Sequence, residues 1–112
     1  MSNKKREKGT PFIGEHTAFV FFTLSPGTEK KVFEDKTPNH NKAMIRLGVG
    51  VAPVTIIIKT RDGLEIMRTI ERNSNSLILQ VENIKRISVR NNSPFVTSNG
   101  TISIEKTFCI FC

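Results

Sequence analysis

The sequence predicts an all-β protein: one jelly-roll or sandwich domain of about eight strands, preceded by an extended N-terminal arm. Three observations support this prediction. The chain has 112 residues, a length that suits one domain with a real core. Its apolar residues are mostly Ile, Val and Phe, the types that favour pleated sheet. Short apolar segments recur every 8–12 residues or so between turn residues, and no helical periodicity lasts longer than a turn.

Residues 1–13 are predicted to form an arm or connector, and residues 14–112 a single domain. The segment from Met1 to Pro11 is polar and basic and ends in Gly9-Thr10-Pro11, a composition typical of a segment that is flexible when alone. Phe12 and Ile13 follow it. Two bulky apolar residues beside such an arm indicate either a docking segment or the start of the first core strand.

The first strand is predicted over residues 17–24, and it is apolar on both faces. Phe19 and Phe21 lie on one face, and Phe22 lies on the other with its apolar neighbours. A strand of a two-layer β protein usually keeps one face for water. A loop, a second sheet or another subunit is therefore expected to cover the second face, which makes Phe19, Phe21 and Phe22 candidate subunit contacts.

Turn residues divide the rest of the chain into further strands. These are predicted over residues 30–35, 43–51, 54–60, 64–70, 77–81 and 84–90, with a short apolar segment at 95–97 between loops and a last strand over 101–112. Asp62-Gly63 predicts a hairpin turn, because Gly accepts a positive φ at little cost. Gly48 and Gly50 indicate a bulge or a close backbone approach. Ser98 to Gly100 is predicted to be a loop.

The last strand has an unusual tip. Its even positions, from Ile102 onward, are mostly apolar and predict a core face, whereas its odd positions are polar until Cys109 and Phe111. Something is therefore expected to cover the tip. Cys109 and Cys112 are a candidate disulfide pair, but residues three apart on a strand are about 10 Å apart, beyond the roughly 7 Å that a disulfide spans. A disulfide to another chain, a curled terminus and two free thiols all stay open.

The residues capable of catalysis are scattered. His16 and His40 are predicted to be exposed turn residues, and two cysteines are too few for a structural zinc site. Cys109 to Cys112 is spelled CxxC but does not begin a helix, where a redox thiolate is stabilised. The acids are predicted to form weak surface pairs with lysines and arginines: Glu29, Glu34, Asp35, Asp62, Glu65, Glu71, Glu82 and Glu105. We therefore predict no enzyme activity, no metal and no cofactor.

The formal net charge is +7. Such a balance permits nucleic-acid binding, with Lys85, Arg86 and Arg90 as contacts and Phe19 and Phe22 as stacking platforms. This is the alternative function. The sequence has no apolar run of about 18 residues, so no membrane helix is predicted. The N-terminus lacks the apolar h-region of a signal peptide. The protein is therefore expected to be made in the cytoplasm and kept inside the cell unless another route releases it.

Several segments resemble the C-terminal half of endospore appendage (Ena) subunits, the fibre proteins on spores of certain bacteria. They are Val54-Thr55-Ile56, Asp62-Gly63, the run from Ser76 to Val89 and the run from Gly100 to Ile110. The resemblance implies a jelly roll with a flexible N-terminal connector, which docks into a neighbouring subunit while sheets stack by strand addition. It implies a homopolymeric filament on the endospore surface (exosporium or coat), made in the mother-cell cytoplasm, with a spore-surface anchor or tip protein as a further candidate partner.

This sequence departs from that family in its arm. In the family's thicker fibres, cysteines of the connector form disulfides with a neighbouring domain, whereas residues 1–10 here contain no cysteine. The resemblance therefore implies non-covalent docking, in which Thr10, Pro11, Phe12 and Ile13 pair along an exposed strand of the next subunit. A head-to-tail contact of this kind does not close and so builds a filament.

Overall fold

A computed structural model describes residues 13–36 and 40–109 of the chain. The predicted all-β fold class is confirmed. The strands are β1 (Ile13–Leu24), β2 (Glu29–Glu34), β3 (Asn41–Val51), β4 (Val54–Thr60), β5 (Glu65–Ile70), β6 (Asn75–Glu82), β7 (Ile84–Arg90) and β8 (Ser98–Cys109). No helix in the described ranges has the length and apolar character needed to cross a membrane.

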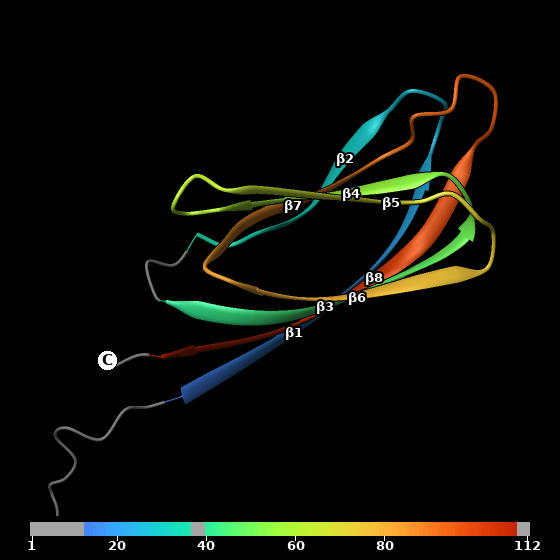
Figure 1. Ribbon diagram of the computed structural model, residues 1–112. Coiled ribbons are helices and arrows are strands. Elements are labelled where there is room, and N and C mark those ends of the chain that lie inside the picture. Colours follow the sequence, from blue (N-terminus) through green and yellow to red (C-terminus); the bar gives the residue numbers. More distant parts are fainter. Residues whose placement is uncertain (1–12, 37–39, 110–112) are drawn as a thin grey trace, which may run out of the picture.

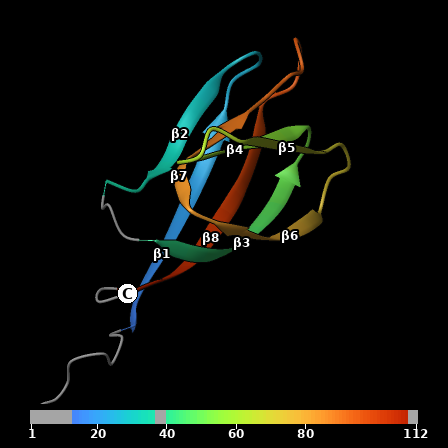
Figure 2. The same cartoon turned by 60° about the vertical axis from the view of Figure 1, so that its left-hand side comes forward.

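The strands form two four-stranded antiparallel sheets packed face to face (Figures 1 and 2). The first sheet has the order β1-β8-β3-β6, and the second has the order β2-β7-β4-β5. The chain passes between the sheets at nearly every connection and stays in one sheet only from β4 to β5. This alternation is the jelly-roll topology. β1 pairs with β8 along its full length, from Ile13 opposite Cys109 to Leu24 opposite Ser98.

The core lies between the two sheets and follows the alternation in the sequence. In β3, the odd-numbered side chains from Ala43 to Val49 are buried, and the residues between them face outward. β4 is buried at six of its seven positions, as expected for an inner strand of its sheet. Ile102 and Ile104 of β8 complete the core, as their even positions predict.

The turn chemistry follows the sequence closely. The Asp62-Gly63 hairpin joins β4 to β5, and Gly63 has a φ of 89°. The bulge predicted near Gly48 and Gly50 is present, because the register of β3 with β8 shifts between Val49 and Val51.

The loop before β8 differs from the prediction. Ser98 to Gly100, predicted as a loop, begin β8, since they pair with the end of β1 and Ser98 Oγ donates to Pro53 O at 2.7 Å. The short apolar segment at 95–97 is irregular instead. Asn91 Nδ2 donates to Val96 O at 2.6 Å and Ser93 Oγ accepts from Val96 N at 3.0 Å, so side-chain hydrogen bonds replace strand pairing there.

The predicted arm lies mostly outside the described residues. Ile13 begins β1, one of the two alternatives for that residue. The arm at residues 1–13 and the domain boundary after it stay predictions.

Candidate functional site

The outer face of the first sheet carries four large apolar side chains. Phe19 and Phe21 on β1, Met44 on β3 and Ile78 on β6 are 58%, 73%, 40% and 57% exposed. We call these four residues the apolar face. Strand register places polar side chains between them, because Phe19 and Ile78 end a row through Ser103 and Arg46. The apolar side chains of β1 and β6 are therefore separated by polar ones and do not form one continuous hydrophobic surface.

Phe19 and Phe21 form one unit on this face. They lie two residues apart on the same side of β1, and their rings meet edge to face with centroids 5.0 Å apart. Phe22 points the other way and is 3% exposed in the core. Of the three phenylalanines predicted as subunit contacts, the structure brings Phe19 and Phe21 together on the surface and places Phe22 between the sheets.

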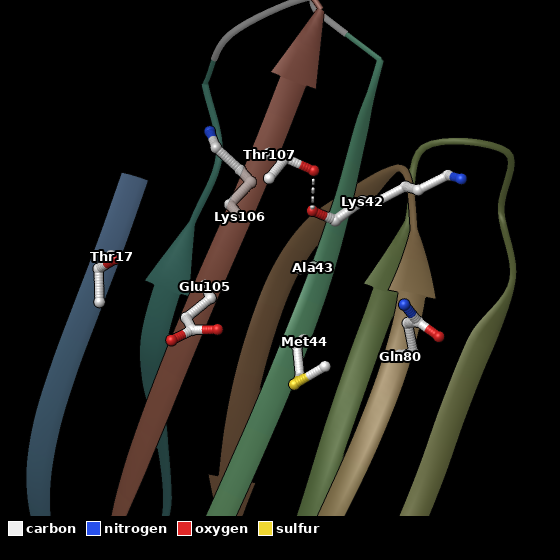
Figure 3. Close-up of a pocket in the computed structure, with 8 residues that line it drawn as sticks. All are labelled: Thr17, Lys42, Ala43, Met44, Gln80, Glu105, Lys106 and Thr107. Carbon is white, nitrogen blue, oxygen red and sulfur yellow. Dashed lines mark hydrogen bonds between the residues drawn. The ribbon is translucent and has the colours of Figure 1, made fainter. Parts of the chain in front are cut away.

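Two hollows lie at the ends of this outer face. One, of about 320 Å³, is lined by residues that include Thr17, Met44 and Glu105, which project from three neighbouring strands (Figure 3). The other, of about 590 Å³, lies beside Phe21 and has Gly48 and Gly100 in its lining. The two hollows and the apolar face lie on the same outer surface of the sheet.

The sheets also offer open edges. Within the part of the chain that the structure describes, β1 and β6 each have a strand neighbour on one side only, and so do β2 and β5. An edge strand presents backbone N–H and C=O groups that another chain can pair with. Edge pairing is thus geometrically available on both sheets.

A buried ionic cluster joins the two sheets at one end of the sandwich. The Asp35 side chain is 1% exposed, and its Oδ2 lies 3.0 Å from Lys106 Nζ and 3.5 Å from Arg61 Nη2. Asn41 Nδ2 donates to the same carboxylate oxygen at 2.9 Å. The prediction that Asp35 forms a surface pair is therefore wrong. The sequence carried one signal of this burial. Lys106 occupies an even position of the last strand, where the other residues are mostly apolar, and a lysine that faces the core needs a buried carboxylate as its partner.

The other acids and histidines behave as surface groups. The hydrogen bond from Lys31 Nζ to Glu34 Oε1, at 2.7 Å, and the positive charge of Lys31 lower the pKa of Glu34 from its ordinary value. Because the pKa of this carboxyl is lower in the folded state, its ionised form stabilises the fold at any pH above the pKa that the group has in the unfolded state. This stabilisation is lost as pH falls through the pKa of the folded state. His16 and His40 are exposed, as predicted, but His16 lies within β1 and not in a turn. His40 Nε2 lies 3.6 Å from Glu82 Oε1.

Several predicted contact residues fall outside the described structure. Thr10, Pro11, Phe12, Phe111 and Cys112 lie outside the described residues, and for Ile13 and Cys109 only the strand positions are described. The contact role of these residues and the candidate disulfide of Cys109 and Cys112 stay predictions.

The residues proposed for nucleic-acid binding do not form one surface. Phe19 lies on the outer face of the first sheet, and Phe22 is in the core. Arg86 and Arg90 line a hollow on the outer face of the second sheet. A nucleic-acid strand could not stack on Phe19 while it contacts these arginines, so the geometry does not support the alternative function. Among the described residues, no three His, Cys, Asp or Glu side chains are grouped to hold a metal ion.

Comparison with solved structures identifies the fold. A Bacillus endospore appendage, from a family of disulfide-linked pili, superposes with a TM-score of 0.77 at 15% identity, over 98% of this chain and 99% of the other. The fold matches that of an endospore appendage subunit. The resemblance found in the sequence is thereby confirmed in three dimensions, and it extends over nearly the whole chain rather than the C-terminal half.

Two other similarities are weaker. An infectious bursal disease virus (Gx strain) structure has a TM-score of 0.46 at 12% identity, over 87% of this chain and 32% of that one. The family 11 carbohydrate-binding module of a Clostridium thermocellum cellulase has a TM-score of 0.34 at 11% identity, over 88% and 85%. Neither bears on function. No protein-family model and no curated protein matches the sequence.

Proposed function

We propose that this protein is a structural subunit of a pilus-like fibre on the endospore surface, in the exosporium or coat. The observation that carries the proposal is the fold match to an endospore appendage over nearly the full length of both chains. A fibre subunit needs surfaces for its neighbours rather than a catalytic centre, so we assign it no enzymatic role. Its principal partner is itself, and a spore-surface anchor or tip protein would terminate the fibre.

Assembly is proposed to depend on the N-terminal arm of one subunit docking on the next. The apolar face offers Phe19, Phe21 and Ile78 to an incoming chain, and the arm carries Pro11 and Phe12 just before β1 begins at Ile13. Burying one such large side chain contributes roughly 1.5–3 kcal/mol. The arm therefore has the chemistry to cover the part of β1 that is apolar on its outer side.

Strand addition is the proposed second contact. Each sheet ends in strands with open edges, so one subunit can pair with a neighbour on either side. A contact between two different edges is head-to-tail, and repetition of such a contact gives an open helical filament. Because residues 1–10 contain no cysteine, the arm docks without a disulfide of its own. Cys109 and Cys112 stay candidates for a bond to another chain.

Deletion of residues 1–12 is expected to abolish filaments and leave a folded monomer, because the deletion removes the docking segment but spares β1. Negative-stain microscopy measures the filaments, and circular dichroism and size exclusion measure the fold and mass. Filaments formed by the shortened chain would contradict arm docking. If the full-length chain forms none under any assembly condition, the fibre function itself is wrong.

The double variant Phe19→Ser and Phe21→Ser is expected to reduce assembly strongly with little loss of stability, since both side chains are already exposed. Phe95→Ser is the matched control, because Phe95 is 88% exposed in the loop before β8 and lies off the apolar face. Sedimentation separates polymer from monomer and gives the polymerised fraction of the natural chain, the double variant and the control. Equal assembly by the double variant and the control would exclude the apolar face as the contact.

A further inference from the structure

The outer face of the second sheet has a character opposite to that of the apolar face. It contains a hollow of about 440 Å³, with Ile57 and Ser88, both buried, in its floor. Four cations line the hollow, and they come from three strands: Lys31, Lys59, Arg86 and Arg90. Two carboxylates, Glu29 and Glu65, also line it, so the lining has an excess of positive charge.

Two of these cations are placed against each other. Arg86 on β7 and Lys59 on β4 are direct cross-strand partners, and both line the same hollow. Like charges directly opposite on a sheet are destabilising. The same row ends in Glu34 on β2 and Glu65 on β5, so positive charge is concentrated at the centre of the sheet.

The neighbouring carboxylates pair with the other three cations rather than with Arg86, and Arg90 Nη1 lies 3.8 Å from Glu29 Oε1. Glu34, the cross-strand partner of Arg86, accepts a hydrogen bond from Lys31 at 2.7 Å. Glu65 Oε2 lies 3.8 Å from Lys59 Nζ, too far for a hydrogen bond. Among the ion pairs of the described residues, none includes Arg86. An anion between Arg86 and Lys59 would remove their repulsion.

We propose that this hollow is a binding site for a phosphate-class oxyanion, held by Arg86 and Lys59 over the Ser88 hydroxyl. The planar guanidinium of Arg86 offers two parallel N–H donors to a tetrahedral oxyanion, and Lys59 adds a second positive charge. Ser88 lies directly opposite Ile57, next to the Arg86–Lys59 pair along the sheet, so its hydroxyl can donate from the floor. Free phosphate and a phosphate group of a polymer share this chemistry.

Equilibrium dialysis of the full chain tests the site and works for monomer and filament alike. The probes are inorganic phosphate and tripolyphosphate at constant ionic strength. Both probes are expected to bind saturably. If tripolyphosphate binds markedly more tightly than phosphate, the ligand of the site is a phosphate chain that also reaches Arg90. If the two affinities are similar, the ligand is a single phosphate group. Loss of one charge-assisted contact by Arg86→Gln is expected to weaken binding about 10-fold or more.

Lys85→Gln is the matched control. It removes the same charge from the preceding residue of β7, which is exposed and does not line the hollow. Equal weakening by Lys85→Gln and Arg86→Gln would show non-specific attraction and overturn the proposal, as would the absence of saturable uptake of both probes.

A second readout separates binding from stability. In phosphate-free buffer, Lys59→Gln is expected to have a melting temperature equal to or above that of the natural chain, because it removes the repulsion with Arg86. Phosphate is expected to raise the melting temperature of the natural chain but not that of Lys59→Gln. A phosphate-induced rise of the same size in both proteins would overturn the assignment of Lys59.

Discussion

Asp35→Asn is expected to lower the free energy of unfolding by about 3 kcal/mol at neutral pH. The substitution keeps the size of the side chain but removes the buried negative charge that Lys106 and Arg61 share. Lys106 has a side chain that is 6% exposed, so its ammonium loses a close counter-charge in a place where water cannot replace it. Urea denaturation monitored by circular dichroism measures the change.

Glu34→Gln is the control for this prediction. Glu34 is the adjacent residue and also pairs with a lysine, but its pair with Lys31 is exposed, with side chains that are 30% and 52% accessible. Exposed ion pairs contribute little, so Glu34→Gln is expected to change stability far less than Asp35→Asn. Similar losses of unfolding free energy in the two variants would mean that the buried Asp35 cluster stabilises the fold no more than an exposed ion pair does.

Gly100→Ala is expected to cost about 1–3 kcal/mol, because a new methyl group has no room at this position. A Cβ at Gly100 would lie 2.9 Å from Phe22 Cζ and 3.3 Å from Val49 Cα, and closer still to the carbonyl oxygen of Gly48. The backbone of β3 would have to move away from β8 along part of their register. Thermal and urea unfolding both report the loss.

Gly48→Ala makes a matched comparison on the neighbouring strand. The nearest atom to a Cβ at Gly48 is Thr101 Oγ1 at 3.3 Å, which belongs to a partly exposed side chain that can turn away. Its cost is therefore expected to be clearly smaller than that of Gly100→Ala. The opposite order would show that the close approach of β3 and β8 at Gly100 does not limit the packing.

The local features of this fold were predictable from the sequence. Alternation of apolar side chains identified the buried face of β3, and the Asp62-Gly63 pair identified the hairpin between β4 and β5. The predicted bulge near Gly50 is present. These features depend on residues close together in the chain, so the sequence contains the information needed to recognise them.

The candidate surfaces were predictable only in part. The two-sided apolar character of residues 17–24 predicted Phe19, Phe21 and Phe22 together as subunit contacts. The first two are exposed, whereas Phe22 packs in the core, a difference that the pattern did not reveal. The hollow on the second sheet was missed, because its cations come from β2, β4 and β7 and converge only when those strands are neighbours.

The sequence by itself determined the β class, most strand positions and the inward faces of β3 and β8, since these follow from period-two patterning and turn residues. The tertiary structure decided which strands are neighbours: β1 lies beside β8, almost the whole chain away. It also decided that Asp35 is buried against Lys106, 71 residues later. Both depend on contacts between distant segments, whose pairing is selected by the burial of the whole core rather than by any local pattern.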